Sequence, residues 1–439
     1  MLNRNMSLSL ALLLATATPT LAGDVHIVDS SGAGDYPTIQ QALNNAADED
    51  LILVRPGSYP SFVVDDLDVS IIADGGTVST GTVRVRDLSA GKTLVIDGLN
   101  AMGASSTSPS ASRGAWFINC SGSIRIQHSS LQAGDSNNTS GESGWAGAHV
   151  ESCLDVSFTE CTLKGSVDSG AYGDNSNTLF AGGDGLHIVQ SLVSVFASEV
   201  IASDGHHSTL YDGGCGGDGV HLSSGSQLIA HSSDFSGGDG GGTSFDFGWG
   251  GDGGNGLRST GSSTADLIGC NLFAGQGAWG SGCVWCGGGE DGSPSSGSSI
   301  TSSPGDPREL CLVGQIGALR EGSSATVHIN GYLGSRATML YSSGSDRRIL
   351  ATPRRLLLLA SPIIRLLPAP APRPLPLDLP AENHLGTWST STLSVTFRAG
   401  SLMPGVEGVR ILTQAMHLPA SGDWTLGAPT ALFVVSPNL

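Results

Sequence analysis

Three histidines recur at one position of a sequence repeat, and this regularity makes them candidates for chemistry. The repeat is marked by five aligned tetrapeptides: Gly114-Ala-Trp-Phe, Gly147-Ala-His-Val, Gly185-Leu-His-Ile, Gly219-Val-His-Leu and Gly256-Leu-Arg-Ser. The position two residues after the glycine holds, in order, Trp116, His149, His187, His221 and Arg258. An imidazole exchanges protons near neutral pH and is also the commonest metal ligand. If the repeats stack, these side chains form a ladder on one face.

Aspartates accompany two of the histidines. Asp184 and Asp218 each lie three residues before a ladder histidine, in Gly-Gly-Asp-Gly. Such pairs could perform acid–base catalysis, so the candidate catalytic residues are His149, His187, His221, Arg258, Asp184 and Asp218. Carboxylates of successive repeats could instead hold a calcium ion, and the candidate metal ligands are Asp184, Asp218 and Asp252. A purely structural interpretation stays open, because aspartates in glycine-rich turns commonly bond the backbone.

Aromatic residues gather in and near the segments between repeats. A ring with an apolar face and a polar tip is a suitable platform for a sugar. The candidate substrate-binding residues are Trp116, Trp145, Tyr172, Tyr211 and Trp249. The same rings could instead pack against one another as small satellite cores.

The repeat itself predicts the fold. The anchoring glycines are 33, 38, 34 and 37 residues apart, and each repeat contains three short runs of alternating apolar residues. Three such strands, with glycines at the corners, bury a continuous core only when the repeats stack as a β-solenoid. We expect an all-β chain with a parallel β-helix over residues 23–303, and a capping helix from Thr38. Insertions before the ladder strands, at about 134–146, 165–184, 203–218 and 237–255, should overhang the ladder and wall a groove.

Two cysteines occupy equivalent positions in adjacent repeats. Cys120 and Cys153 each lie six residues after the anchoring glycine. Adjacent coils of a solenoid stack about 4.8 Å apart, within the Cα separation that a disulfide accepts. We therefore predict a Cys120–Cys153 disulfide.

The N-terminus and the charge indicate the compartment and the class of partner. Arg4, a short apolar run and the small residues before Gly23 are typical of a signal peptide over residues 1–22, so we expect a secreted or cell-surface protein without a transmembrane segment. The net charge is −19, which argues against a nucleic acid as partner. An acidic polysaccharide would bind only through a bridging cation, for which Ca²⁺ is the candidate. We expect the chain to be a monomer.

The repeat pattern stops near residue 304. Four strands are expected beyond this point, around Thr326, Val395, Ile411 and Val434, with a proline-rich crossing at 368–380. The segment from Ser421 to Leu432 resembles a small β-sandwich module that ends many large secreted bacterial proteins. We expect residues 304–439 to form such a module, and capping of the solenoid is the favoured role over surface attachment.

One resemblance extends beyond the repeats. Asp35-Tyr-Pro-Thr-Ile-Gln-Gln-Ala-Leu followed by Leu51-Ile-Leu-Val-Arg-Pro-Gly-Ser-Tyr resembles the opening of the pectate-lyase-like right-handed parallel β-helix superfamily. The resemblance implies a right-handed solenoid and a cleft like the groove predicted above. It carries no activity, because the catalytic patterns of pectate lyases, polygalacturonases and pectin methylesterases are not matched.

Two functions follow from these observations. The first is a secreted β-helix protein that interacts with extracellular polysaccharide, and that acts as a polysaccharide lyase or a glycoside hydrolase if it is an enzyme. The second is a noncatalytic structural or adhesive surface protein, in which the solenoid is a rod. An open groove with facing side chains favours the first function, and insertions folded flat over the ladder favour the second.

Overall fold

A computed structural model describes residues 23–303 with a few gaps and, beyond them, mainly strands. The gaps before 303 are 107, 136–143, 167–180, 209–211, 245–247 and 281–287. The later described segments are 311–313, 318–320, 323–331, 336–342, 348–349, 356–357, 364–365, 377–378, 391–398, 407–418, 425–436 and 439. The predicted signal peptide lies outside the described residues.

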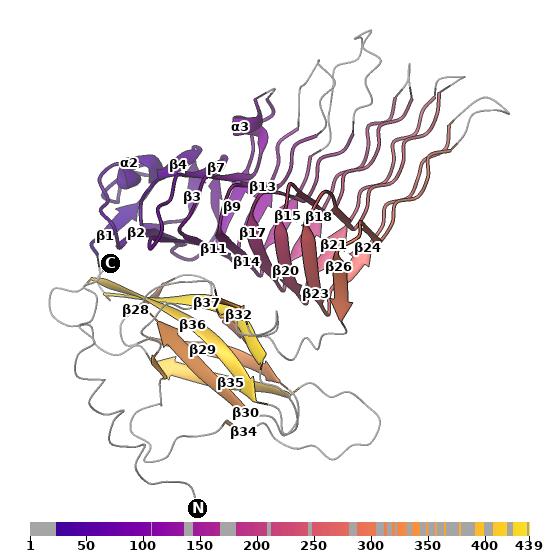
Figure 1. Cartoon of the computed structure of the whole chain (residues 1–439). Coiled ribbons are helices and arrows are strands. Elements are labelled where there is room, and N and C mark those ends of the chain that lie inside the picture. The colour runs from indigo at the N-terminus through magenta and orange to yellow at the C-terminus, as the bar shows by residue number, and fades with distance from the viewer. Residues whose placement is uncertain are drawn as a thin grey trace, which may run out of the picture.

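Residues 23–303 form three stacks of parallel strands, in the part of the chain described (Figure 1). The first is a ten-stranded sheet: β1 (Val25–Val28), β2 (Asp50–Val54), β5 (Val69–Ala73), β8 (Thr93–Asp97), β11 (Ser123–Gln127), β14 (Asp155–Thr159), β17 (Leu192–Phe196), β20 (Gln227–His231), β23 (Thr264–Ile268) and β26 (Ile300–Ser303). The second, called the ladder sheet below, contains β4 (Phe62–Asp65), β7 (Val83–Arg86), β10 (Ala115–Ile118), β13 (Ala148–Glu151), β16 (Leu186–Val189), β19 (Val220–Ser223), β22 (Leu257–Ser259) and β25 (Ser295–Ser296). The third contains β3 (Gly57–Tyr59), β6 (Val78–Thr80), β9 (Leu99–Met102), β12 (Ser130–Gln132), β15 (Thr162–Lys164), β18 (Glu199–Ile201), β21 (Asp234–Ser236) and β24 (Asn271–Phe273). The chain is therefore a parallel β-helix over these residues, as the repeats predict.

Side chains of the three sheets fill one apolar core. On the ladder sheet, the residues one and three after each anchoring glycine point inward, and Phe117 and Val150 are fully buried. A column of small residues lies between the first and third sheets, where Cys161 N donates to Ser198 Oγ and Ser198 N donates to Ser233 Oγ. These bonds link one coil to the next, so the polar groups of the column are satisfied inside the core.

The corners differ from the prediction. The anchoring glycines do not turn the chain; they permit close approach, since a Cβ on Gly147 would lie 2.5 Å from Lys164 N. The left-handed backbone conformation is adopted instead by other residue types, with φ of 48° at His128, 52° at Glu160 and 50° at Ser232. One left-handed residue per corner is tolerated because the stacked coils fix its conformation.

Two short helices lie near the N-terminal coils. Helix α2 (Ile39–Leu43) begins at Thr38, whose Oγ1 accepts a hydrogen bond from Gln41 N. Its buried residues, Ile39, Ala42 and Leu43, join the main core. Helix α3 spans Pro109–Ser112. No helix among the described residues has the length and apolar character needed to cross a membrane.

Beyond residue 304 the described strands form mostly antiparallel sheets. One contains β27 (Cys311–Val313), β29 (Ser324–Gly331) and β35 (Ser391–Arg398). The larger one contains β28 (Leu319–Arg320), β37 (Thr425–Val435), β36 (Gly408–Leu418), β30 (Arg336–Ser342) and β33 (Ile364–Arg365), with β34 (Leu377–Asp378) also on β30. A third pair is β31 (Arg348–Ile349) with β32 (Leu356–Leu357). All four expected strands are present, and the proline-rich crossing lies almost wholly outside the described residues.

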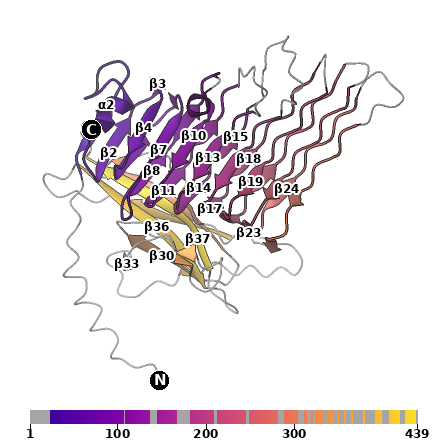
Figure 2. The ribbon, with the colours of Figure 1, turned by 45° about the horizontal axis from the view of Figure 1, so that its top comes forward.

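This C-terminal part packs on the flank of the β-helix rather than on its last coil (Figure 2). Phe433 lies in an apolar cluster with Leu53 and Ile72, on the outer face of the ten-stranded sheet. The Gln127 amide exchanges two hydrogen bonds with the backbone of Ala431. The expected capping of the solenoid end is therefore not what these contacts show. The apolar runs of β2 and β5 are buried on both faces because a second layer covers them.

The insertions leave the β-helix side by side as extended chains, and we call this array the glycine slab (Figures 1 and 2). Its outgoing segments are 165–166, 202–208, 236–244 and 274–280, and its returning segments are 181–184, 212–218, 248–255 and 288–292. Neighbouring coils bond within a layer, as where Gly216 N donates to Asp252 O. The two layers also bond to each other, as where Gly217 N donates to Ser203 O. The expected overhanging loops are thus an ordered, two-layered extension of the coils.

Candidate functional site

The predicted ladder is present in register on the outer face of the ladder sheet. Trp116 pairs with His149, His149 with His187, His187 with His221, and His221 with Arg258. The rings of His187 and His221 are stacked, with centroids 4.7 Å apart and planes 14° apart. The His149 and His187 rings meet edge to face at 5.0 Å. Parallel pairing of successive coils therefore brings residues more than thirty positions apart into one row.

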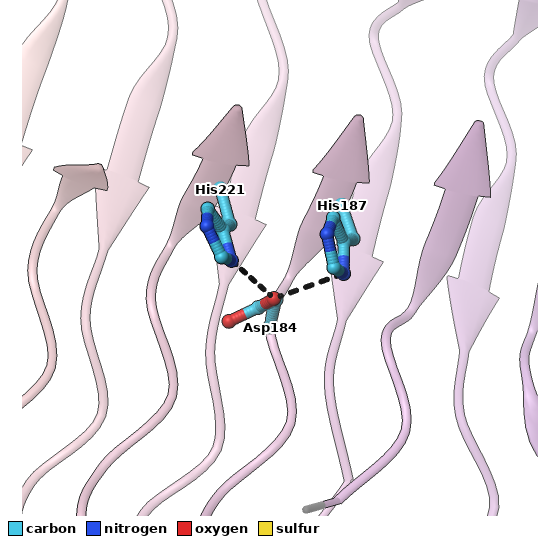
Figure 3. A group of neighbouring side chains, drawn as sticks. All are labelled: Asp184, His187 and His221. Atoms are coloured by element: carbon cyan, nitrogen blue, oxygen red, sulfur yellow. Dashed lines mark ion pairs between the residues drawn. The ribbon is translucent and has the colours of Figure 1, made fainter. Parts of the chain in front are cut away.

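Asp184 lies between two of the histidines (Figure 3). Its Oδ2 is 3.5 Å from Nδ1 of His187 and 3.5 Å from Nδ1 of His221. Its other oxygen, Oδ1, accepts a hydrogen bond from the backbone N–H of Asp218. The carboxylate is thus held by the next coil and directed at the two rings.

The other aspartates repeat part of this arrangement. Asp218 Oδ1 accepts from the backbone N–H and side-chain amide of Asn255, and its Oδ2 is 3.6 Å from Arg258 Nη1. Asp252 Oδ1 accepts from the backbone N–H of Glu290. Each aspartate therefore accepts a hydrogen bond from the backbone of the following coil. This is a structural role, similar to the backbone bonding that the sequence analysis kept as an alternative to chemistry. The second oxygens of Asp184 and Asp218 are directed at ladder side chains.

Trp116 at the start of the ladder and Trp145 beside it both contact other protein groups instead of being open platforms for a sugar. Trp116 lies between the guanidinium groups of Arg84 and Arg113, at 4.7 and 4.8 Å from its ring. Trp145 is 7% exposed, and its indole N–H donates to Ser106 O. Trp145 lines the groove as a buried ring, whereas Trp116 lies outside the groove lining with two guanidinium groups against its ring.

A cavity of about 560 Å³ runs along the ladder. One side is the outer face of the ladder sheet, and the other is the returning layer of the glycine slab. Its lining residues are Arg113, Gly144, Trp145, Ala146, His149, Ala181, Gly182, Asp184, His187, Cys215, Gly216, Gly217, Asp218, His221, Asp252, Gly253, Gly254, Asn255 and Arg258. All six candidate catalytic residues and all three candidate metal ligands therefore face one groove.

Burial controls the protonation of several groups in the groove. Burial, with the charges of Arg113 and His187, lowers the pKa of His149 to about 2. Burial also lowers the pKa of His187, against the opposing charge of Asp184. The pKa of Asp218 is raised by burial and by the nearby charge of Asp184. His149 and His187 are therefore neutral at neutral pH, and a neutral imidazole nitrogen can donate a lone pair to a metal.

The donor atoms do not suit calcium as the sequence suggested. Among the described residues, one group of potential ligands gathers: Asp184, His187 and His221, whose donor atoms all lie within 4.8 Å of one another. Calcium takes six to eight oxygen ligands, whereas two of these three donors are nitrogens. Asp218 and Asp252 are not part of this group. A calcium ion shared by the three aspartates does not fit this geometry.

The remaining predicted residues fall in three classes. Cys120 and Cys153 are buried neighbours on adjacent coils but are free thiols, so the structure contains no Cys120–Cys153 disulfide and the bridge stays a prediction. Tyr172 and Tyr211 lie outside the described residues. Trp249 is 56% exposed and belongs to the distal part of the slab, outside the cavity lining.

Two lining residues with hydrogen-bonding side chains, Arg113 and Asn255, were not among the predicted site residues. Arg113 directly precedes the first anchoring glycine and lies over Trp116 and Trp145. Asn255 occupies the position of Asp184 and Asp218 in the last full repeat, and it accepts a hydrogen bond from Ser293 N. Alignment of the residue before each anchoring glycine would have revealed both.

Comparison with known proteins adds no name to this geometry. No family model, no curated protein and no solved structure matches the chain. The groove is therefore the feature of the chain that bears most directly on its function.

Proposed function

We propose that this chain is an exported β-helix protein of the right-handed, pectate-lyase-like kind, and that its groove binds an extracellular polysaccharide. The observation that carries the proposal is the cavity of about 560 Å³ that follows the ladder from coil to coil. Each coil adds one polar ladder side chain and one stretch of glycine-rich wall. A row of donors and acceptors at a regular spacing is complementary to a linear polymer with regularly spaced hydroxyl groups.

Turnover in the groove would use the residues that face it. Asp184, His187 and His221 supply a carboxylate and two imidazoles within reach of one another, which is the material of general acid–base catalysis. Arg258 adds a cation 3.6 Å from Asp218. A lyase or a hydrolase is the enzyme class that such a groove supports.

The rest of the architecture belongs to the same proposal. Helix α2 covers the open first coil, since an uncovered edge of a solenoid invites aggregation. The strands beyond residue 304 form a β-sandwich module that shields the flank of the ten-stranded sheet. The acidic surface admits a polyanionic glycan only with a bridging cation, for which calcium is the candidate.

A noncatalytic structural or adhesive role is the second candidate. The observation that favours it is the use of Asp204, Asp239 and Asp252 as acceptors for backbone N–H groups of the next coil. These carboxylates serve the stacking of the slab, as in a rod. The slab stands beside the ladder and leaves the groove open, and this favours the first candidate.

A panel of acidic and neutral polysaccharides, with and without Ca²⁺, tests the proposal. We expect the purified chain to be retained by at least one polysaccharide gel, and unsaturated products or new reducing ends would establish turnover. The double variant His187→Ala/His221→Ala should lose retention at unchanged thermal stability, while His207→Ala, an exposed histidine elsewhere on the slab, should retain it. Absence of retention across the panel, with no products, would leave the structural role.

A further inference from the structure

The cluster of Asp184, His187 and His221 has the donor set of a transition-metal site. Zinc takes imidazole nitrogen and carboxylate oxygen at about 2.0–2.2 Å, usually in a tetrahedron. The edge between two ligands of such a tetrahedron is about 3.3 Å long. Both Asp184–histidine distances are 3.5 Å, so the carboxylate already lies at the spacing of a bound ligand set.

The three side chains are partly ordered for this task without a metal. Asp184 is fixed by the N–H of Asp218, and the two histidines are fixed by the pairing of β16 with β19. A hydrogen bond from the protein to a ligating carboxylate is the usual support of a metal site. Two ligands of one metal ion lie at most about 4.2 Å apart. The donor atoms of the three side chains lie within 4.8 Å of one another, so the stacked rings need to move only slightly toward each other to bind an ion.

The cluster is also accessible to an ion. The side chains of Asp184, His187 and His221 are 17%, 29% and 21% exposed, and all three line the groove. Three protein ligands leave one tetrahedral position for a water or a ligand oxygen, as in catalytic zinc sites. The nearby His149 Nδ1 is buried without a hydrogen-bond partner in the described structure, so a further neutral nitrogen lies next to the cluster along the ladder.

We propose that Asp184, His187 and His221 bind one divalent transition-metal ion of the zinc class, with its open coordination position directed into the groove. The bound ion would make the groove a Lewis-acidic site for a hydroxyl or carboxylate oxygen. Calcium is disfavoured there because it prefers oxygen ligands, whereas two of the three ligands are imidazole nitrogens, which suit zinc and similar metals. This inference is independent of which polymer, if any, the groove binds.

Metal titration of the full chain tests the site. The chain is purified with an affinity tag that contains no histidine, and bound metal is removed with a chelator before the titration. Cobalt(II) should develop the visible absorption bands of tetrahedral coordination, and zinc should displace it at one ion per chain. Excess Ca²⁺ should leave the cobalt spectrum unchanged. No saccharide is present, so a failure here is distinguishable from a failure of glycan binding.

Three variants make the assignment specific. Asp184→Asn keeps the oxygen that accepts from Asp218 N, and should weaken zinc by more than the roughly 10–100-fold that loss of an outer partner costs. His187→Ala/His221→Ala should abolish the cobalt bands, and His207→Ala should preserve them. Thermal unfolding of the parent chain should rise on adding zinc, a readout that needs no variant. Absence of stoichiometric zinc binding to the parent, equal affinity in Asp184→Asn, or displacement by Ca²⁺ would overturn the proposal.

Discussion

The β-helix body and the glycine slab solve the same stacking problem in opposite ways. In the body, side chains fill the space between coils, and Phe117 meets Phe158 edge to face at 5.9 Å. In the slab, side chains are removed, and backbone meets backbone. A Cβ on Gly251 would lie 1.9 Å from the carbonyl oxygen of Gly214. Hydrogen bonds within and between the layers replace the apolar core there, because backbone N–H and C=O groups that are packed away from water must be paired.

The comparison explains how the groove is built. The body supplies one outward side chain per coil at a fixed spacing, and the slab continues that spacing as a wall. Both regions have one period because the same coil passes through each. The site therefore requires the side-chain packing of the body and the close glycine packing of the slab together.

The largest expected effect is loss of a core ring in the body. Phe158 is fully buried, and Phe158→Ala should lower the free energy of unfolding by about 3–5 kcal/mol. Chemical denaturation followed by circular dichroism measures this loss. A loss below about 1 kcal/mol would contradict the view that side-chain packing holds the coils of the body together.

The next effect concerns a buried charge of the body. Burial lowers the pKa of His128, but hydrogen bonds and charges from Asp97 and Glu160 outweigh it and raise the pKa to about 10. The folded state thus binds the proton more tightly than the unfolded state, so the stabilisation is full below about pH 6.5 and is lost as pH rises through about 10. Denaturation at pH 7 and pH 10 should show a loss of about 3–4 kcal/mol.

His128→Gln is the control for this titration. Its stability should vary less between the two pH values than that of the parent chain. An identical pH dependence in the two proteins would assign the titration to another group.

A smaller loss is expected when the slab gains a methyl group. Gly251→Ala places its Cβ against backbone that cannot rotate away, and overpacking of this kind costs about 1–3 kcal/mol. Gly288→Ala is the matched control, since the nearest atom to its Cβ would be 3.4 Å away. Equal stability of the two variants would show that close backbone packing does not hold the slab.

The smallest effect separates charge from hydrogen bonding in the slab. Asp239 Oδ1 accepts from the N–H of Gln276 on the next coil. Asp239→Ala removes the acceptor and should cost about 1 kcal/mol, whereas Asp239→Asn keeps an acceptor oxygen and should cost little. A loss in Asp239→Asn as large as that in Asp239→Ala would mean that charge, rather than the bond, matters. Thermal unfolding of the two variants side by side makes the comparison.

The sequence predicted the body better than the slab. The glycine repeat and the alternating runs gave the coils and the order of the ladder from Trp116 to Arg258, because a period of one coil fixes which residues align. The sequence predicts loops where the slab lies, because glycine-rich segments without alternating apolar residues have no strand signal. The backbone hydrogen bonds of these segments depend on neighbouring coils, which the local sequence does not reveal. The structure buries β2 and β5 on both faces, and nothing in the repeat pattern indicates that strands beyond residue 304 cover them.

The site was predicted in part for the same reason. Register placed His187 beside His221, but the position of Asp184 between them depends on how the slab enters the strand. Trp116 and Trp145 were expected to be platforms. Arg113 lies over both rings, and the Trp145 indole N–H donates to the backbone of Ser106, a contact that the repeat does not predict.

Retention on the polysaccharide selected by the panel, measured by affinity electrophoresis of two variants, tests the central claim most directly. The groove variant, His221→Ala/Arg258→Ala, changes two ladder residues. The distal variant, Trp249→Ala/Trp279→Ala, removes exposed rings of the slab, 56% and 83% accessible. We predict that the groove variant migrates freely and the distal variant is retarded like the parent chain. Retardation of the groove variant with free migration of the distal variant would contradict the account and place binding on the slab.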